Sequence, residues 1–428
     1  MTSYIGTPEG NKQIKKFWFG TDTWKDAKSV YYGEPSGWSK LFSGIQTTFW
    51  RYYNAGGMYT AASTNTSAFS YQNRIRNLDS ETISEIIIDF GSVYTSGAPL
   101  IGAAVSFGGT GDLPGPGGWQ RVTFGGQPGF SYPLSGSVKE PKLVSSDPIV
   151  VSGGWTSGAS MLIRIGYGPG WVIAPSKSIA TEITWPSNNK RYAGDVVSTD
   201  ELLTQNPAWT GTTYAPSWYA IRVKRVTPKP MILVHGDSVA TQVRAIAATN
   251  TSSGYGWVMR MNELTESYHI VSMGIGGSSM ADSEARTPEL LEMHKDYITH
   301  MMIQSWSGNG SPVSIADCER IKTNIINMET AILAAGKKVL CVTLKPHGGT
   351  ISTQEEIDAY WHMVDWSTAR YGINHINLSQ EITLSNDGGM TLINSEDNVH
   401  FNATGQLIQA TALKPILDAA LLYDGYEV

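Results

Sequence analysis

Two short segments, far apart in the chain, carry the residue types of a serine nucleophile and its base. A Gly-Asp-Ser turn ending at Ser238 follows the apolar run 231–234, and an Asp-x-x-His segment near the C-terminus runs from Asp397 to His400. A carboxylate three residues before a histidine can reach the imidazole Nδ1–H, which fixes the tautomer and leaves Nε2 to take a proton from a serine. The spacing predicts Ser238 as nucleophile, His400 as base and Asp397 orienting that base. Taken alone, however, Gly-Asp-Ser is more often an ordinary turn or a helix cap.

Two further turns supply candidate hydrogen-bond donors for the oxyanion of such a reaction. Glycines follow the predicted strand 269–273, and they let the backbone turn sharply so that an N–H can approach a ligand. Asn309 follows the predicted strand 298–304, and its side-chain amide can direct a donor at a developing oxyanion. The structural alternatives are a flexible strand-to-helix turn for the first segment and an Asx-turn for the second.

Two side chains near these turns are candidates for substrate contact. Trp306 shortly precedes Asn309 and can form an apolar wall against a sugar ring. His347 follows the predicted strand 338–344, and it lacks a carboxylate at a triad-like spacing, which favours a pocket or loop role over that of the base. No group of His, Cys and carboxylate residues has the spacing of metal ligands, so metal-assisted hydrolysis is disfavoured. Attack by a serine with a histidine base requires no other cofactor.

In their order and setting, the four segments resemble the SGNH (GDSL-type) hydrolase family, whose blocks are Gly-Asp-Ser, a glycine turn, a Gly-x-Asn loop, and Asp-x-x-His before a terminal helix. The resemblance covers the C-terminal half of the chain. It implies a triad of Ser238, His400 and Asp397. It also implies an oxyanion hole made by the backbone N–H groups of Ser238 and Gly277 with the side-chain amide of Asn309. The third block reads Ser-Gly-Asn-Gly where the family has Gly-x-Asn-Asp, which leaves open how the oxyanion hole is completed.

The elements that must position these segments alternate between short apolar strands and helices. Such alternation is typical of a parallel sheet covered by helices on both faces, with ligands bound at the carboxyl ends of the strands. We therefore expect an α/β fold for residues 229–428, which the resemblance makes a three-layer, flavodoxin-like SGNH hydrolase domain. The expected strands are 231–234, 269–273, 298–304, 338–344 and 375–378, and the expected helices are 257–264, 283–295, 315–335, 355–371 and one after Asn402.

The residues before this domain have a different pattern. From 46 to 228, short apolar runs with a period of two alternate with Gly, Pro and Ser, which favours an antiparallel, jelly-roll-like β-sandwich whose loops can bind carbohydrate. Pro228 and Pro230 mark its end, because proline cannot donate a hydrogen bond to a central ladder. Residues 1–45 contain a short internal echo, in which an aromatic-Gly pair is followed by a Trp and then a Lys, first from Phe19 to Lys25 and again from Tyr32 to Lys40. This echo suggests paired small hairpins, so we expect a separate N-terminal β extension there.

Composition argues against several classes of partner. The 428 residues carry a net charge of −6 and no Lys/Arg cluster that could follow a phosphate backbone, so nucleic acid is not an expected partner. The sequence contains no uninterrupted run of about 18 apolar residues, so no membrane span is predicted. Cys318 and Cys341 fit buried thiols better than a disulfide framework. The N-terminus lacks the apolar stretch of a secretory signal, which leaves the location open between the cell interior, release by lysis or in a particle, and loss of a native signal.

The expected reaction is ester hydrolysis through an acyl-enzyme, with the O-acetyl groups of a polysaccharide as substrate. The 14 Trp and 20 Tyr suit stacking on sugar rings, although packing in the core is the alternative role for most of them. A β-sandwich ahead of an esterase domain also resembles carbohydrate-active members of the family. Two alternatives stay open: a glycan-binding or virion structural module with a degenerate esterase domain, and a lipase or thioesterase. The N-terminus faintly resembles bacteriophage tail proteins, which are often trimers, so we also consider a homo-oligomer.

Overall fold

The computed structural model divides the chain into two compact units, residues 1–49 and 50–428, and each is described by itself. The structure describes residues 4–7, 10–13, 29–34, 37–43, 49–53, 63–64, 69–77, 80–92, 99–109, 113–131, 142–169, 172–173, 190–192, 199–204, 210–211, 219–225, 229–240, 244–246, 250–252, 256–307, 309, 314–344, 353–379, 395 and 399–428.

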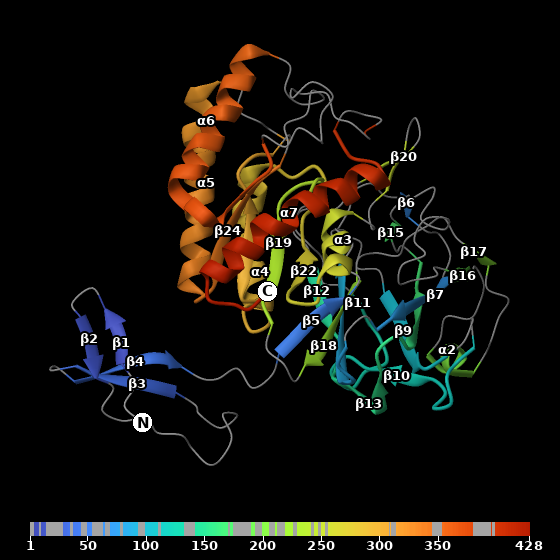
Figure 1. Ribbon diagram of the computed structural model, residues 1–428. Coiled ribbons are helices and arrows are strands. Elements are labelled where there is room, and N and C mark those ends of the chain that lie inside the picture. Colours follow the sequence, from blue (N-terminus) through green and yellow to red (C-terminus); the bar gives the residue numbers. More distant parts are fainter. Residues whose placement is uncertain are drawn as a thin grey trace. The chain divides into compact units, whose positions relative to one another are not determined.

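The N-terminal unit contains two antiparallel hairpins, drawn in blue in Figure 1. In the first, β1 (Tyr4–Thr7) pairs with β2 (Gly10–Gln13). In the second, β3 (Ser29–Glu34) pairs with β4 (Gly37–Ser43). The second copy of the sequence echo, from Tyr32 to Lys40, falls within this hairpin, and the first copy, from Phe19 to Lys25, lies outside the described residues.

The second unit begins with two antiparallel sheets that enclose one apolar core. Buried isoleucines from both sheets meet in this core, among them Ile75 and Ile163 from one sheet and Ile88 and Ile221 from the other. An antiparallel β-sandwich therefore precedes the α/β part, in agreement with the fold class expected from the sequence. The first sheet has the order β10 (Gln120–Val122), β9 (Pro99–Phe107), β14 (Ser160–Tyr167), β7 (Phe69–Arg76), β16 (Lys190–Tyr192) and β17 (Thr210–Gly211), with β11 (Phe130–Ser131) also paired to β9; the second has β12 (Lys142–Ser145), β8 (Ile83–Ser92), β18 (Tyr219–Arg225) and β5 (Phe49–Tyr53), with β13 (Ile149–Trp155) also paired to β8. A short pair, β6 (Ser63–Thr64) with β15 (Val172–Ile173), and the helix α2 (Thr199–Thr204) complete the described elements of this part.

From Met231 onward the sheet is parallel, as the alternation of apolar strands and helices predicts. Every side chain of its first three strands along the sequence is buried, because helices cover both faces and leave no solvent-exposed side. The strand order is β22 (His269–Ser272), β19 (Met231–His235), β23 (His300–Gln304), β24 (Lys338–Thr343) and β25 (His375–Asn377). The first strand of this sheet in sequence order, β19, thus lies between β22 and β23.

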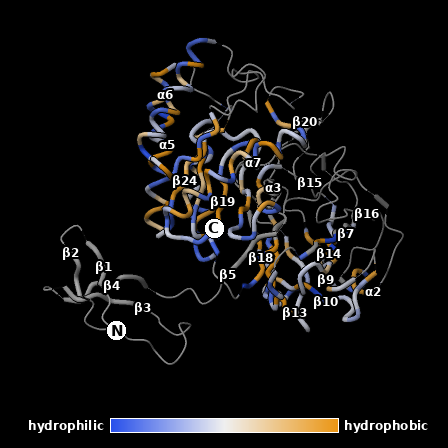
Figure 2. Tube along the Cα trace, viewed as in Figure 1, coloured by the Kyte–Doolittle hydropathy of each residue, from blue (hydrophilic) through white to orange (hydrophobic). Residues whose placement is uncertain are grey.

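Alternate residues of β19 enter two different cores, one on each face of the sheet. Met231 and Leu233 pack on one face, together with residues of α4 (Met280–His294), α5 (Ile315–Ala334) and α6 (Gln354–Tyr371). Ile232 and Val234 pack on the other, with residues of α3 (Trp257–Leu264) and α7 (Ala403–Tyr423). The result is a three-layer α/β architecture (Figure 1), and hydrophobic residues concentrate in its central strands (Figure 2).

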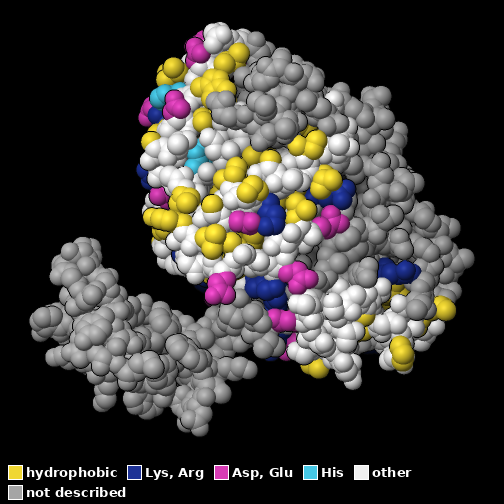
Figure 3. All heavy atoms as spheres, viewed as in Figure 1, with side chains coloured by type: hydrophobic (Ala, Val, Ile, Leu, Met, Phe, Trp, Pro, Cys, Tyr) yellow, Lys and Arg dark blue, Asp and Glu magenta, His cyan; other side chains and the backbone are white. Residues whose placement is uncertain are grey.

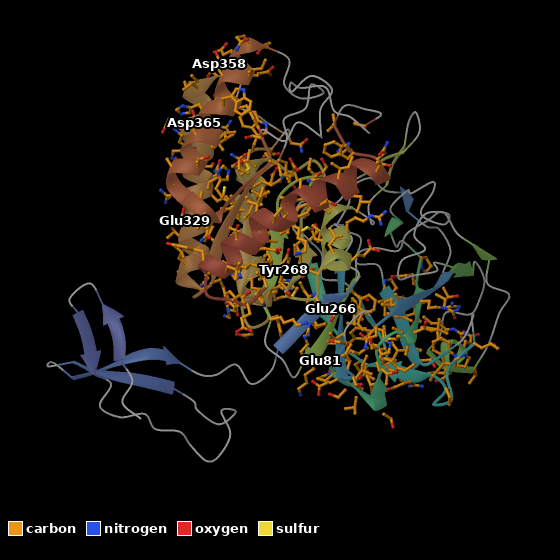
Figure 4. The ribbon with its side chains drawn as sticks, in the orientation of Figure 1. Glu81, Glu266, Tyr268, Glu329, Asp358 and Asp365 are labelled. Atoms are coloured by element: carbon orange, nitrogen blue, oxygen red, sulfur yellow. The ribbon has the colours of Figure 1, made fainter. Side chains whose placement is uncertain are left out.

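Polar contacts connect the helices of the outer layer and leave a mixed surface. Glu329 of α5, labelled in Figure 4, accepts hydrogen bonds from Arg370 Nε at 2.7 Å and from the Tyr371 hydroxyl at 2.9 Å, both at the end of α6. On the face drawn in Figure 3, acidic and basic side chains are interspersed among the described residues. None of the described helices is both long enough and apolar enough to cross a membrane.

Candidate active site

The structure brings Ser238 and His400 into hydrogen-bond contact across 162 positions of the chain. The distance from His400 Nε2 to Ser238 Oγ is 3.0 Å, and both residues are partly exposed. A neutral imidazole with its proton on Nδ1 accepts a hydrogen bond from the serine hydroxyl at Nε2, which is the arrangement of a nucleophile and its general base. Asp397, predicted to orient the base, lies outside the described residues, as does His347.

The turn that presents Ser238 depends on a glycine. A Cβ atom at Gly236 would lie 1.9 Å from Oε1 of Gln304, so no other residue fits without displacing that side chain. Gln304 ends β23, and its Oε1 accepts a hydrogen bond from Asp237 N at 2.7 Å. The carboxylate of Asp237 accepts one from Val239 N at 2.9 Å, which closes an Asx-type turn around Ser238. The nucleophile turn is therefore held by its own backbone and by the neighbouring strand.

The two turns with candidate oxyanion donors flank the nucleophile turn. Gly277 follows β22 and Asn309 follows β23, and these are the two strands on either side of β19. Because parallel strands end at the same edge, all three turns lie together there. Gly277 has a φ of +79° and an exposed position, so its backbone conformation is one that other residues rarely adopt. The roles of Gly277 and Asn309 in an oxyanion hole stay predictions.

The segment carrying His400 is fixed by the start of α7. The Asn402 side chain accepts hydrogen bonds from Thr404 N at 3.1 Å and Gly405 N at 3.2 Å, so Asn402 is the N-cap of α7. The carbonyl of His400 accepts a hydrogen bond from Ser395 Oγ at 2.8 Å. These contacts fix the backbone on both sides of the imidazole.

Two buried charged or titratable residues lie behind the nucleophile turn. His235 Nε2 is 2.7 Å from the carbonyl of Ser283, and burial together with the charge of Arg286 lowers the pKa of His235 to about 3. This histidine is neutral at physiological pH, and it must donate from Nε2, so it cannot compete with His400 as base. Burial also lowers the pKa of Arg286 to about 10, which leaves it protonated at neutral pH.

The aromatic residues near the motifs pack in the core. Trp306 is only 8% exposed and packs edge to face with Tyr360, their ring centroids 5.3 Å apart. Trp257 is fully buried. The structure therefore corrects the expectation that Trp306 forms an apolar wall against a sugar ring, because its ring is used in packing. Among the described residues, no group of three or more His, Cys, Asp or Glu side chains is placed to hold a metal ion.

Three residues of this edge were not identified from the sequence: Gln304, Arg286 and Ser307. Arg286 could have been found, since it is the one arginine among the buried residues of α4, and arginine is rarely buried without a partner. Ser307 occupies the first position of the third motif block. The sequence shows that a hydroxyl is present there, but it does not show which groups that hydroxyl contacts. Gln304 offered no signal, because it reads as the end of an apolar strand.

No protein-family model and no curated protein matches the chain. Solved structures match its C-terminal part, and they include members of the GDSL family that the motifs resemble. The structure of TesA is 21% identical over 44% of this chain and 99% of that one, with a TM-score of 0.33. A putative lipolytic protein of the G-D-S-L family from Desulfitobacterium hafniense is 14% identical over 44% of this chain and 99% of that one, with a TM-score of 0.35. A carbohydrate acetylesterase family member from Sinorhizobium meliloti is 12% identical over 45% of this chain and 99% of that one, with a TM-score of 0.36.

Similarities of this size leave the chemistry to be argued from the chain's own residues. The likeness of the N-terminus to phage tail proteins finds no support in these comparisons.

Proposed function

We propose that this protein is a serine esterase in which Ser238 is the nucleophile and His400 the general base. The observation that carries the proposal is the 3.0 Å contact between His400 Nε2 and Ser238 Oγ at the carboxyl edge of the parallel sheet. A serine hydroxyl is a weak nucleophile at neutral pH, and a base in this position activates it. The proposal does not require a metal or an organic cofactor.

The reaction follows from the two groups in contact. Ser238 Oγ attacks the ester carbonyl carbon while its proton passes to His400 Nε2, and the carbonyl oxygen becomes an oxyanion. When the carbon–oxygen bond to the alcohol breaks, the leaving alkoxide takes the proton from His400, and the acyl group stays on Ser238. Water then attacks this acyl-enzyme and gives a proton to His400. When the bond between the acyl carbon and Ser238 Oγ breaks, the serine oxygen takes that proton back from His400 and the acid leaves. We assign Asp397 to hold the imidazole during both transfers.

The oxyanion needs donors that are in place before the charge develops. We propose that they are the backbone N–H groups of Ser238 and Gly277 and the side-chain amide of Asn309. Their placement on three adjacent turns supports this assignment. Removal of one such donor typically slows an acyl-transfer enzyme by about 10²- to 10³-fold.

We further propose O-acetyl groups on a polysaccharide as the substrate. Support comes from the β-sandwich ahead of the α/β part and from the aromatic-rich composition. Since Trp257 and Trp306 are core residues, any stacking on sugars must use other aromatic side chains. A lipase or thioesterase is the alternative hydrolase, and it predicts activity that rises with acyl-chain length.

The test compares hydrolysis of p-nitrophenyl acetate, butyrate and octanoate, followed by acetate release from acetylated polysaccharides. The variants are Ser238→Ala and, as a control, Ser305→Ala, which removes a buried serine hydroxyl at the end of the neighbouring strand β23. We expect acetate to be the best ester and Ser238→Ala to lose at least about 10⁴-fold in kcat. Equal turnover by wild type and Ser238→Ala would reject the mechanism, while preference for octanoate would reject the acetyl specificity only.

A second candidate function is a glycan-binding or virion structural module with a degenerate esterase domain. The altered third block, in which Gly310 replaces the family's Asp, favours it. Such a module would bind acetylated glycan without releasing acetate. Binding and acetate release measured on the same glycan therefore separate the two functions.

A further inference from the structure

One buried hydroxyl contacts all three turns at the candidate active edge. Ser307, which is 2% exposed, lies between β23 and Asn309. Its Oγ is 2.7 Å from Asp237 Oδ2 and 2.9 Å from the carbonyl of Ser278, and it accepts a hydrogen bond from Asn309 N at 3.1 Å. A hydroxyl carries a single proton, so the carboxylate and the carbonyl share it, while a lone pair receives the Asn309 N–H.

The three partners of this hydroxyl are direct neighbours of the groups proposed to react. Asp237 precedes the nucleophile Ser238, Ser278 follows Gly277, and Asn309 itself carries the proposed side-chain donor. The hydroxyl therefore ties the three turns to one point. Because one partner is a buried carboxylate, the bond from Ser307 is charge-assisted and stronger than a bond between neutral groups.

A second side chain, Arg286 of α4, connects two of the same turns from behind. Its Nη1 donates to Ser278 Oγ at 2.7 Å, and its Nη2 lies 3.4 Å from the carbonyl of Gly236. The guanidinium is buried and remains protonated at neutral pH, and the charges of Asp282 and Asp237 favour that protonated form. Arg286 thus supports the turns from the helix side, while Ser307 supports them from the strand side.

We propose that Ser307 is a positioning residue for this site, a role that rests on the esterase function proposed above. Its hydroxyl keeps the nucleophile turn and the two donor turns at the separation that the tetrahedral intermediate needs. Ser307 does not contact substrate in this role, so its loss acts on the chemical step and leaves ground-state binding nearly unchanged. A displacement of about 1 Å between reacting groups can lower a rate by about 100-fold.

The experiment replaces Ser307 with Ala and, as a smaller second variant, with Gly. Ser305→Ala is the matched control, because Ser305 is two residues away and equally buried, but its hydroxyl bonds to Thr343 rather than to the three turns. The measurements are kcat and KM for p-nitrophenyl acetate. Active sites are counted from the final extent of labelling by diethyl p-nitrophenyl phosphate, and thermal melting is followed by circular dichroism. Counting sites removes any contribution from unfolded protein.

We expect both Ser307 variants to lose about 10- to 100-fold in kcat per labelled site while KM changes by less than about threefold. Ser305→Ala keeps the wild-type kcat. A wild-type kcat in Ser307→Ala, or an equal loss in Ser305→Ala, overturns the positioning role while the esterase function stands. Absence of Ser238-dependent turnover in the wild type is a different result, since it rejects the proposed function and the positioning role with it.

Amide hydrogen exchange gives a readout that does not depend on turnover. The Asn309 N–H donates to Ser307 Oγ, so it exchanges faster in Ser307→Ala than in wild type or Ser305→Ala. Unchanged exchange at Asn309 contradicts the contact on which the positioning role depends.

Discussion

Substitution of Gly236 by alanine tests how tightly the nucleophile turn is built. The new Cβ would lie 1.9 Å from Gln304 Oε1. Gln304 would have to move by about 1.5 Å to reach an ordinary contact distance, which breaks its 2.7 Å hydrogen bond from Asp237 N. An unpaired buried N–H costs about 1–3 kcal/mol, and overpacking adds about 1–3 kcal/mol, so we expect a loss of about 2–6 kcal/mol.

The turn itself would also move, and with it Ser238. We therefore expect kcat for p-nitrophenyl acetate to fall by about 100-fold in Gly236→Ala. Thermal melting measured by circular dichroism reports the stability loss. The matched control is Gly117→Ala, because a Cβ at Gly117 meets nothing within 4 Å. If Gly236→Ala melts and turns over like Gly117→Ala, the close approach of Gln304 is not what shapes the turn.

Three further predictions concern stability and the placement of the base. Arg222 and Asp89 form a buried ion pair at 2.7 Å, with side chains 4% and 3% exposed, so Arg222→Met should lose about 3–5 kcal/mol. Arg121→Met, which breaks the exposed ion pair of Arg121 with Asp200, should lose less than about 1 kcal/mol. Equal melting temperatures for Arg222→Met and Arg121→Met would refute this difference. Burial lowers the pKa of His235 to about 3 and of His375 to about 4, from an ordinary 6.5. Below pH 7 the unfolded chain therefore binds more protons than the folded protein, so the melting temperature should fall as the pH drops from 7 to 5. The fall should be less steep in His375→Gln, and an equal slope in this variant and the wild type would contradict the contribution of His375. Asn402→Ala should lose about 1 kcal/mol and lower kcat, since it uncaps the helix beside the base; unchanged melting and unchanged kcat would contradict that role.

Much of the α/β fold could be predicted because its strands are buried on both faces. Continuous apolar runs such as 231–234, separated by long helical stretches, have few other solutions. The same pattern placed Ser238 at the carboxyl edge of the sheet, whereas His400 was predicted from the Asp-x-x-His spacing and from the family resemblance. The sequence also contained the signal for the start of α4, where Ser279 and Asp282 form a capping box, yet the helix was expected to begin three residues later.

Other features depend on tertiary context. The hairpin of β20 (Arg244–Ile246) and β21 (Asn250–Ser252) was missed, because strands of three residues are too short to show a hydrophobic period. The contacts of Ser307 depend on β19 lying between β22 and β23, and sequence order alone does not reveal that arrangement. The core positions of Trp257 and Trp306 were also hidden, since composition says how many aromatic residues exist but not which of them are buried.

The most direct test of the central claim is covalent labelling with diethyl p-nitrophenyl phosphate, followed by peptide mass spectrometry of the wild type and His400→Gln. Because His400 Nε2 lies 3.0 Å from Ser238 Oγ, we predict one diethylphosphoryl group per chain on Ser238, formed with release of one p-nitrophenolate. His400→Gln should label far more slowly. Labelling at another residue, or equal labelling rates with and without His400, would contradict the account.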